Sequence, residues 1–121
     1  MKSILITSVG NKVPLIEDLR RVIIEEFKSS YSIVGTDVSA NIISKYFLDH
    51  FVLFDNSLSL TDEYTKIVID YKVKIIIPTR DGELLYFSEN KNYFKSLGVY
   101  IPISEKDVID VLVDKLKFYE F

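Results

Sequence analysis

IIIPTRDGELL, residues 75–85, is the stretch of this sequence that decides the fold. A β-branched apolar run stops at Pro78 and is followed by a threonine, an arginine and two carboxylates around a glycine. Near-continuous apolar runs of this length are typical of parallel strands whose two faces are both covered by helices. In an open parallel sheet, ligands bind outside the carboxyl ends of the strands. The loop after residue 77 is therefore where we expect a small-molecule site.

Similar apolar runs alternate with longer amphipathic ones along the rest of the chain. This alternation predicts parallel strands joined by right-handed helical crossovers. The expected fold class is α/β, a three-layer doubly wound domain with a mainly parallel sheet of about five strands. The predicted strands cover residues 4–9, 31–35, 51–54, 74–77 and 99–103, and the predicted helices cover 14–27, 40–46, 60–71, 84–97 and 105–121.

Composition excludes several classes of protein. The net charge is -3 and the basic residues are scattered among acidic ones, which disfavours a nucleic-acid partner. The 121 residues contain no cysteine, so neither a disulfide framework nor thiolate chemistry is available. The sequence shows no signal peptide and no apolar run long enough to span a membrane, so we expect a cytoplasmic protein without a membrane partner.

The first loop, with Gly10, Asn11 and Lys12, precedes a predicted helix. Free N–H groups at a helix N-terminus favour an anion, and Lys12 adds a positive charge. However, a dinucleotide fingerprint needs three glycines, and Gly10 is the only one here. NAD binding is therefore not expected, and the loop is either a substrate or anion contact or a plain turn.

Four charged residues follow the second and fourth strands. Asp37 lies where dinucleotide-binding folds place a ribose-binding carboxylate, although Asp37 or Ser39 could equally cap the next helix. Arg80 could bind a carboxylate or phosphate through two parallel hydrogen bonds, with Asp81 and Glu83 beside it. The alternative is a helix start in which Asp81 is the cap, Glu83 favours the helix dipole and Arg80 pairs with one of them.

The histidine and the aromatic residues of the sequence do not indicate a catalytic or metal site. His50 is the single histidine, so neither a zinc site nor Ser-His catalysis is supported. Tyr86, Phe87, Tyr93 and Phe94 recur at helical spacing and are predicted to belong to the core rather than to a base-stacking platform. We therefore assign no catalytic residue and no metal ligand.

Four ordered segments together resemble the front of ATP-grasp ligases. They are ILITSVGNKVPLIEDLRR (4–21), IVGTDVSANIISKYFLD (33–49), IIIPTRDGELLYFSENK (75–91) and DVIDVLVDKLKFYEF (107–121). The likeness is nearest to the N-terminal, Rossmann-like pre-ATP-grasp domain of carbamoyl-phosphate-synthetase large-subunit-like proteins. It implies a pre-ATP-grasp domain over residues 1–104 and a helix over 105–121 that leads toward an ATP-grasp core.

The resemblance also implies a function. Such ligases join an acid to an amine or ammonia through an acyl phosphate formed from ATP and magnesium. On this analogy the substrate-binding residues are Gly10, Asn11, Lys12, Asp37, Arg80, Asp81 and Glu83, and Lys115 touches the nucleotide phosphates. The chain would be the substrate-side domain, inactive by itself and without tightly bound cofactor, with downstream ATP-grasp domains and a small-molecule acid as partners.

Two other hypotheses stay open. One is a stand-alone Rossmann-like module that binds a small ligand or nucleotide. The other is an oligomerisation domain, in which the last helix packs against a second copy, and a homodimer is also compatible with the ligase hypothesis. The last helix carries Phe118 and Phe121 near its end, and apolar residues at such a position suggest a missing partner surface. A truncated piece of a longer ligase is therefore expected.

Overall fold

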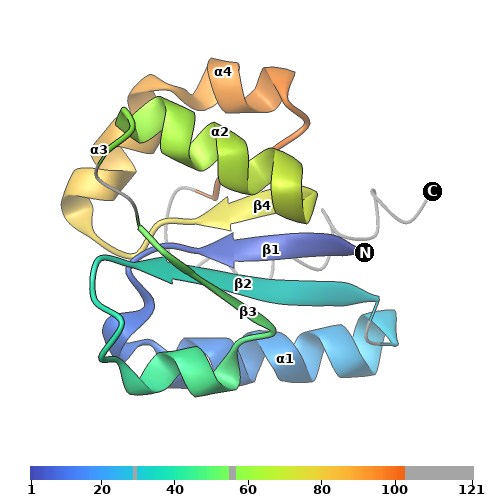
Figure 1. Ribbon diagram of the computed structural model, residues 1–121. Helices are drawn as coiled ribbons and strands as arrows, with labels where there is room; N and C mark the ends of the chain where they lie inside the picture. The colour runs from blue at the N-terminus through green and yellow to red at the C-terminus, as the bar shows by residue number, and fades with distance from the viewer. Residues whose placement is uncertain (29, 55–56, 103–121) are drawn as a thin grey trace.

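The computed structural model describes residues 1–28, 30–54 and 57–102. Within these residues one parallel sheet forms, with the strand order β3-β2-β1-β4. Its strands are β1 (Lys2–Ile6), β2 (Tyr31–Asp37), β3 (His50–Leu53) and β4 (Val73–Ile77). The chain moves from β1 outward to β3 and then returns to place β4 on the other side of β1 (Figure 1). This reversal between β1 and β4 is the position at which open α/β sheets bind ligands.

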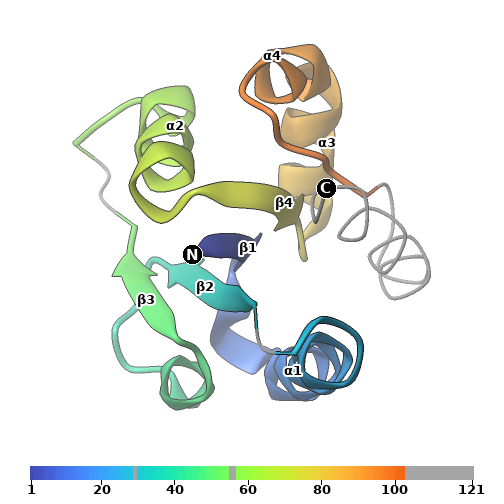
Figure 2. The ribbon, with the colours of Figure 1, turned by 90° about the vertical axis from the view of Figure 1, so that its right-hand side faces the viewer.

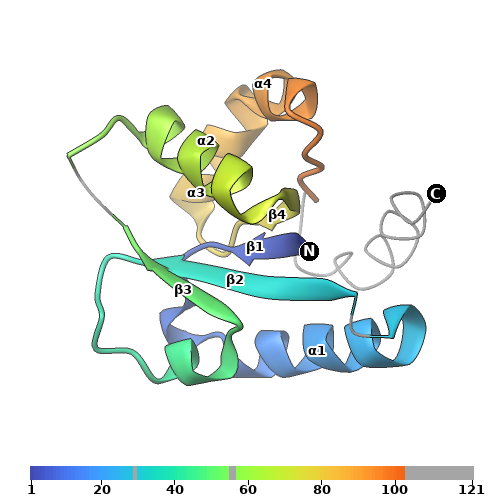
Figure 3. The ribbon, with the colours of Figure 1, turned by 45° about the vertical axis from the view of Figure 1, so that its right-hand side comes forward.

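Helices cover both faces of the sheet, which gives the three predicted layers (Figures 2 and 3). One face carries α1 (Val13–Phe27) and the 3-10 segment η2 (Ile43–Phe47), while a 3-10 turn, η1 (Val9–Asn11), leads into α1. The other face carries α2 (Leu60–Tyr71), α3 (Asp81–Glu89) and α4 (Lys91–Ser96). The fold class expected from the sequence, a Rossmann-like α/β domain, is confirmed.

Alternating side chains of the strands supply a separate core on each face. In β1, Ile4 and Ile6 pack toward α1, while Leu5 between them packs toward α2 and α3. All three are completely buried. Burial on both faces explains why the strand sequences read as continuous apolar runs.

Local signals position the helix starts. Pro14 lies in the first turn of α1, where its missing N–H leaves no helical hydrogen bond unmade. Ser59 caps α2, because its side chain accepts a hydrogen bond from the Asp62 N–H at 3.1 Å.

The sheet has four strands rather than about five. At the position expected for a fifth strand, residues 99–103, Tyr100 forms a single parallel bridge with Ile75. Two hydrogen bonds support it: the Tyr100 N–H donates to Lys74 O at 2.9 Å, and the Ile76 N–H donates to Tyr100 O at 3.0 Å. Pro102 has no N–H to donate, so the ladder does not extend through it.

Two predicted helices also differ from the structure. The helix expected over residues 84–97 divides into α3 and α4 at Asn90, whose side-chain amide donates to Tyr86 O at 2.8 Å. The helix expected over 40–46 is the 3-10 segment η2 instead. In the segment before η2, Asp37 accepts from the Ser39 N–H and Ser39 accepts from the Asn41 N–H, so local side-chain bonds hold this segment in a non-helical turn.

Residues 103–121 lie outside the described part of the chain. This range includes the predicted last helix and Lys115. Among the described residues, no helix has the length and apolar character needed to cross a membrane.

Candidate functional site

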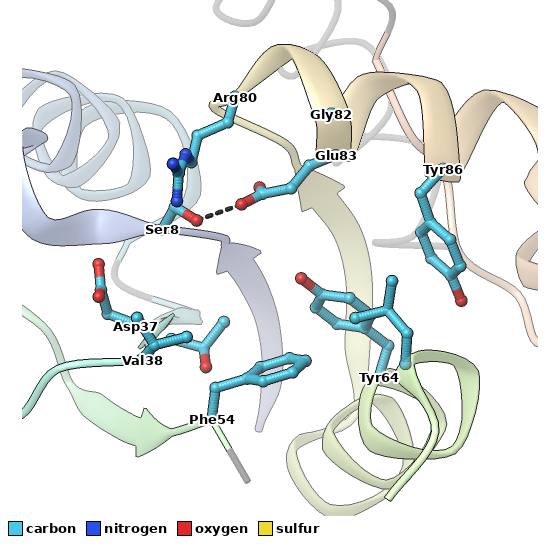
Figure 4. Close-up of a pocket in the computed structure, with 11 residues that line it drawn as sticks. Ser8, Asp37, Val38, Phe54, Tyr64, Arg80, Gly82, Glu83 and Tyr86 are labelled. Atoms are coloured by element: carbon cyan, nitrogen blue, oxygen red, sulfur yellow. Dashed lines mark hydrogen bonds between the residues drawn. The ribbon is translucent and has the colours of Figure 1, made fainter. Parts of the chain in front are cut away.

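Glu83 fastens the first turn of α3 to the end of β1. Its two carboxylate oxygens accept hydrogen bonds from the hydroxyl groups of Thr7 and Ser8 (Figure 4 shows the Ser8 bond). Thr7 is completely buried, and Ser8 has a left-handed backbone conformation with φ of 49°. A positive φ is unfavourable for serine, so neighbouring contacts must hold it there. We call Thr7, Ser8 and Glu83 the β1–α3 clamp.

A threonine strengthens the same junction. The Thr79 hydroxyl donates to Thr7 O at 2.7 Å, and the Thr7 N–H donates to Ile77 O at 3.1 Å. The ends of β1 and β4 are therefore joined through main chain and side chains at the point where the strand order reverses.

Asp37 braces the same loop from the other side. Its Oδ2 accepts a hydrogen bond from the Gly10 N–H at 3.0 Å, and its Oδ1 accepts one from the Ser39 N–H at 3.1 Å. A Cβ atom at Gly10 would lie only 3.3 Å from Asp37 Oδ2, so glycine permits this close approach. The N–H group that was expected to face an anion is thus already bound to a carboxylate.

A pocket of about 340 Å³ opens beside these contacts (Figure 4). It lies at the carboxyl ends of the strands and is bounded by α2 and α3. Its polar lining residues are Ser8, Thr36, Asp37, Arg80 and Glu83, and the others are Val38, Phe54, Leu60, Tyr64, Gly82 and Tyr86. The site therefore has a charged end against β1 and β2 and an apolar, largely aromatic end against α2.

Arg80 is the basic residue among the described residues that line the pocket. It is exposed and immediately precedes α3. Its side chain extends from α3 toward Ser8 and the Asp37 side of the pocket (Figure 4). Within the described part of the chain, the guanidinium makes no ion pair or hydrogen bond, so it can bind an anion. The predicted pairing of Arg80 with Asp81 or Glu83 is not observed.

Two tyrosines of the pocket stay protonated to more alkaline pH than usual. Burial raises the pKa of Tyr64 strongly, and the nearby negative charge of Glu83 raises it further. Burial also raises the pKa of Tyr86, against a smaller lowering by its hydrogen bond with Thr61. Both hydroxyl groups are therefore neutral at physiological pH and act as ordinary hydrogen-bonding groups.

The structure brings three of the predicted site residues to the pocket and leaves others outside it. Asp37, Arg80 and Glu83 line the pocket, whereas Gly10, Asn11, Lys12 and Asp81 are not among its lining residues, and Lys115 lies outside the described residues. Asp81 does not cap α3, because the cap position is Arg80 and no side chain bonds there. Substrate binding by these residues stays a prediction.

Sequence reasoning missed the aromatic end of the pocket. Phe54 directly follows β3, Tyr64 lies on α2, and Tyr86 lies on a helical face that was predicted to belong to the core. Phe87 and Phe94 are indeed buried, as predicted, whereas Tyr93 is 41% exposed. One signal was present: a tyrosine on a buried helix face needs a partner for its hydroxyl, and a ligand can be that partner.

The donor set of this site does not fit a magnesium ion. No group of three or more potential metal-ligating side chains occurs among residues 1–28, 30–54 and 57–102. The loop that follows β1, residues 7–12, is called the β1 loop below. The two carboxylates of the pocket, Asp37 and Glu83, both accept hydrogen bonds from this loop. A triphosphate would also meet these two negative charges at the reversal point of the sheet.

Comparison with known proteins gives one family. Residues 4–103 match the family model described as PylC-like, N-terminal domain, so the match covers most of the chain. The search of curated proteins found no match to the chain.

Proposed function

The chain belongs to the PylC-like N-terminal domain family, the pre-ATP-grasp domain of ATP-grasp ligases, and from this we propose that it forms the substrate-side wall of such a ligase. The complete enzyme would join a carboxylic acid to an amine or to ammonia in an ATP-dependent reaction. Carbamoyl-phosphate-synthetase-like chemistry is the finer form of this proposal, and it rests on the sequence resemblance. A cytoplasmic location is likewise an expectation from the sequence.

The observation that carries the proposal is the position of Arg80, the basic residue that lines the pocket. Arg80 reaches into the site with no acidic partner among the described residues, while Asp37 and Glu83 are turned to the β1 loop. A guanidinium in this position recognises a carboxylate through two parallel hydrogen bonds. The role of this wall is therefore to bind and orient the acid.

ATP and magnesium belong, on this proposal, to the ATP-grasp domains. When bound there, they would supply the phosphoryl group that activates the acid as an acyl phosphate. In the pre-ATP-grasp wall, the carboxylates of Asp37 and Glu83 lie beside the β1 loop, where a nucleotide-binding module would need to hold phosphate. This arrangement favours the ligase over the alternative of a stand-alone nucleotide-binding module.

The test compares ATP consumption with and without the ATP-grasp region. We expect negligible ADP formation by the 121-residue chain. When the chain is joined to the ATP-grasp domains of its ligase, ADP formation should depend on added acid and amine. Hydrolysis by the chain alone at ordinary enzyme rates, about 1–10³ s⁻¹, would contradict the proposal.

A second measurement examines the alternative directly. Nucleotides at millimolar concentration should leave the melting temperature of the chain unchanged. Strong stabilisation by a nucleotide, with hydrogen-exchange protection at Gly10 and Asp37, would favour the nucleotide-binding module instead.

A further inference from the structure

The pocket has two chemically different ends, and together they specify a class of ligand. We propose that it binds a small carboxylic acid with an apolar, ring-sized body, a specification that rests on the proposed function. The carboxylate lies on Arg80, and the body lies against Phe54, Leu60 and Tyr86. The shared chemistry is the same for a plain acid and for an α-amino acid with such a side chain.

The charged end selects a monoanion. Arg80 supplies one positive charge, and Asp37 and Glu83 lie on the same side of the pocket (Figure 4). A phosphate ester carries about -1.5 to -2 charges at neutral pH, so it would be repelled more strongly by the two carboxylates than a single carboxylate would be. An α-ammonium group, in contrast, would be attracted to them.

The opposite end selects an apolar body. The ring centroids of Phe54 and Tyr64 are 5.3 Å apart, and those of Tyr64 and Tyr86 are 6.0 Å apart. The Tyr86 hydroxyl lies 2.7 Å from the Thr61 hydroxyl, so the ring is what Tyr86 offers to the pocket. With Leu60, these rings form a surface that an aromatic or branched aliphatic group covers well.

The Tyr64 hydroxyl is an independent sign of a ligand. Tyr64 is only 4% exposed, and its hydroxyl points into the pocket (Figure 4). It makes no hydrogen bond with any described residue. A tyrosine as buried as this one normally has a partner for its hydroxyl, and Tyr64 lines the pocket. The ligand therefore supplies a hydrogen-bonding atom near Tyr64.

The size of the pocket agrees with this class. A volume of about 340 Å³ lies at the lower end of the range of roughly 300–1,000 Å³ for ligand pockets. An acid with one ring is small enough for this volume, whereas a dinucleotide is among the larger ligands of that range.

The experiment measures binding to the 121-residue chain by titration calorimetry, without ATP. The four probes are 3-phenylpropionate, L-phenylalanine, the uncharged 3-phenylpropanamide and acetate. At least one of the two ring-bearing acids should bind saturably, and the tighter one identifies the source as a plain acid or an amino acid. The amide and acetate should each bind roughly tenfold more weakly or worse, because each lacks one half of the recognition.

Variants then assign the contacts. Arg80→Gln should weaken binding of the tighter acid roughly tenfold, and Tyr64→Phe, which keeps the ring, roughly fivefold. Arg21→Gln, an exposed arginine on α1 outside the pocket, is the matched control and should bind like the parent chain.

Three outcomes would overturn the proposal. They are no saturable binding of either ring-bearing acid, equal binding of acetate or of the amide, and unchanged binding after Arg80→Gln. None of them concerns ATP consumption by the joined ligase. If one of the three is found while the joined ligase still forms ADP with another acid, this ligand class is disproved and the proposed function stays intact.

Discussion

The β1–α3 clamp should contribute strongly to stability, and the variant Glu83→Ala tests it. This substitution removes the carboxylate that accepts hydrogen bonds from both Thr7 and Ser8. Thr7 is completely buried, so water does not readily replace the lost acceptor. The left-handed backbone of Ser8 also loses one of the contacts that hold it.

The expected magnitude follows from the two bonds. A hydrogen bond to a charged group contributes about 1.5–3 kcal/mol, and because Glu83 is partly exposed we take the lower value for each, about 3 kcal/mol together. At an unfolding entropy of about 2.1 cal/mol/K per residue, 121 residues give roughly 0.25 kcal/mol/K. The melting temperature should therefore fall by about 12 °C.

Thermal and urea unfolding, followed by circular dichroism, measure this change. Asp81→Ala is the matched control, because Asp81 is an exposed acid in the same first turn of α3 and makes no hydrogen bond through its side chain in the described structure. It removes the same favourable interaction with the helix dipole, about 0.3–1 kcal/mol. If Glu83→Ala and Asp81→Ala destabilise the domain equally, the clamp does not contribute and the reasoning is wrong.

Three further changes test other parts of the fold. Gly35→Ala should destabilise by about 1–3 kcal/mol in urea unfolding, because the new Cβ would lie 2.5 Å from Leu48 Cδ1 and 2.8 Å from Val9 Cγ1; an unchanged midpoint would show that both side chains move freely. Ser59→Ala should lower the free energy of unfolding by about 1 kcal/mol through loss of the α2 cap, and Ser59→Asp should restore it. Above pH 10, the ordinary pKa of tyrosine, the unfolded chain loses the Tyr64 proton while the folded chain keeps it, so stability should fall as pH rises. Tyr64→Phe should show a shallower fall in alkaline urea titrations, and equal slopes would contradict the raised pKa.

The layer structure was predictable from the sequence because it depends on repeated local patterns. Continuous apolar strands and amphipathic helices alternate, and this pattern alone places the carboxyl ends of the strands at one edge. Asp37 and Arg80 were both predicted to bind substrate; Asp37 is the last residue of β2, Arg80 follows β4, and both line the pocket.

The contacts that organise this edge were not predictable in the same way. Glu83 and Thr7 are 76 positions apart, and nothing in either segment specifies that their side chains meet. The helix that carries Tyr64 was predicted, but helical periodicity does not tell how near to the carboxyl ends of the strands a residue lies. Tyr64 is at the end of the core, where the pocket begins. The fifth strand was predicted from apolar residues alone, without considering that Pro102 cannot donate to the ladder.

The β1 loop is held by hydrogen bonds from two sides, and this affects how fast and how tightly a ligand binds to the pocket. Asp37 holds Gly10, and Glu83 holds Ser8, so the backbone at this edge is ordered before any ligand arrives. Ordering a flexible loop would otherwise reduce the affinity, since each residue fixed costs about 1–2 kcal/mol of conformational entropy. A ligand of this pocket loses little of its binding energy in that way, and its association rate should be set by diffusion and charge steering rather than by a loop rearrangement.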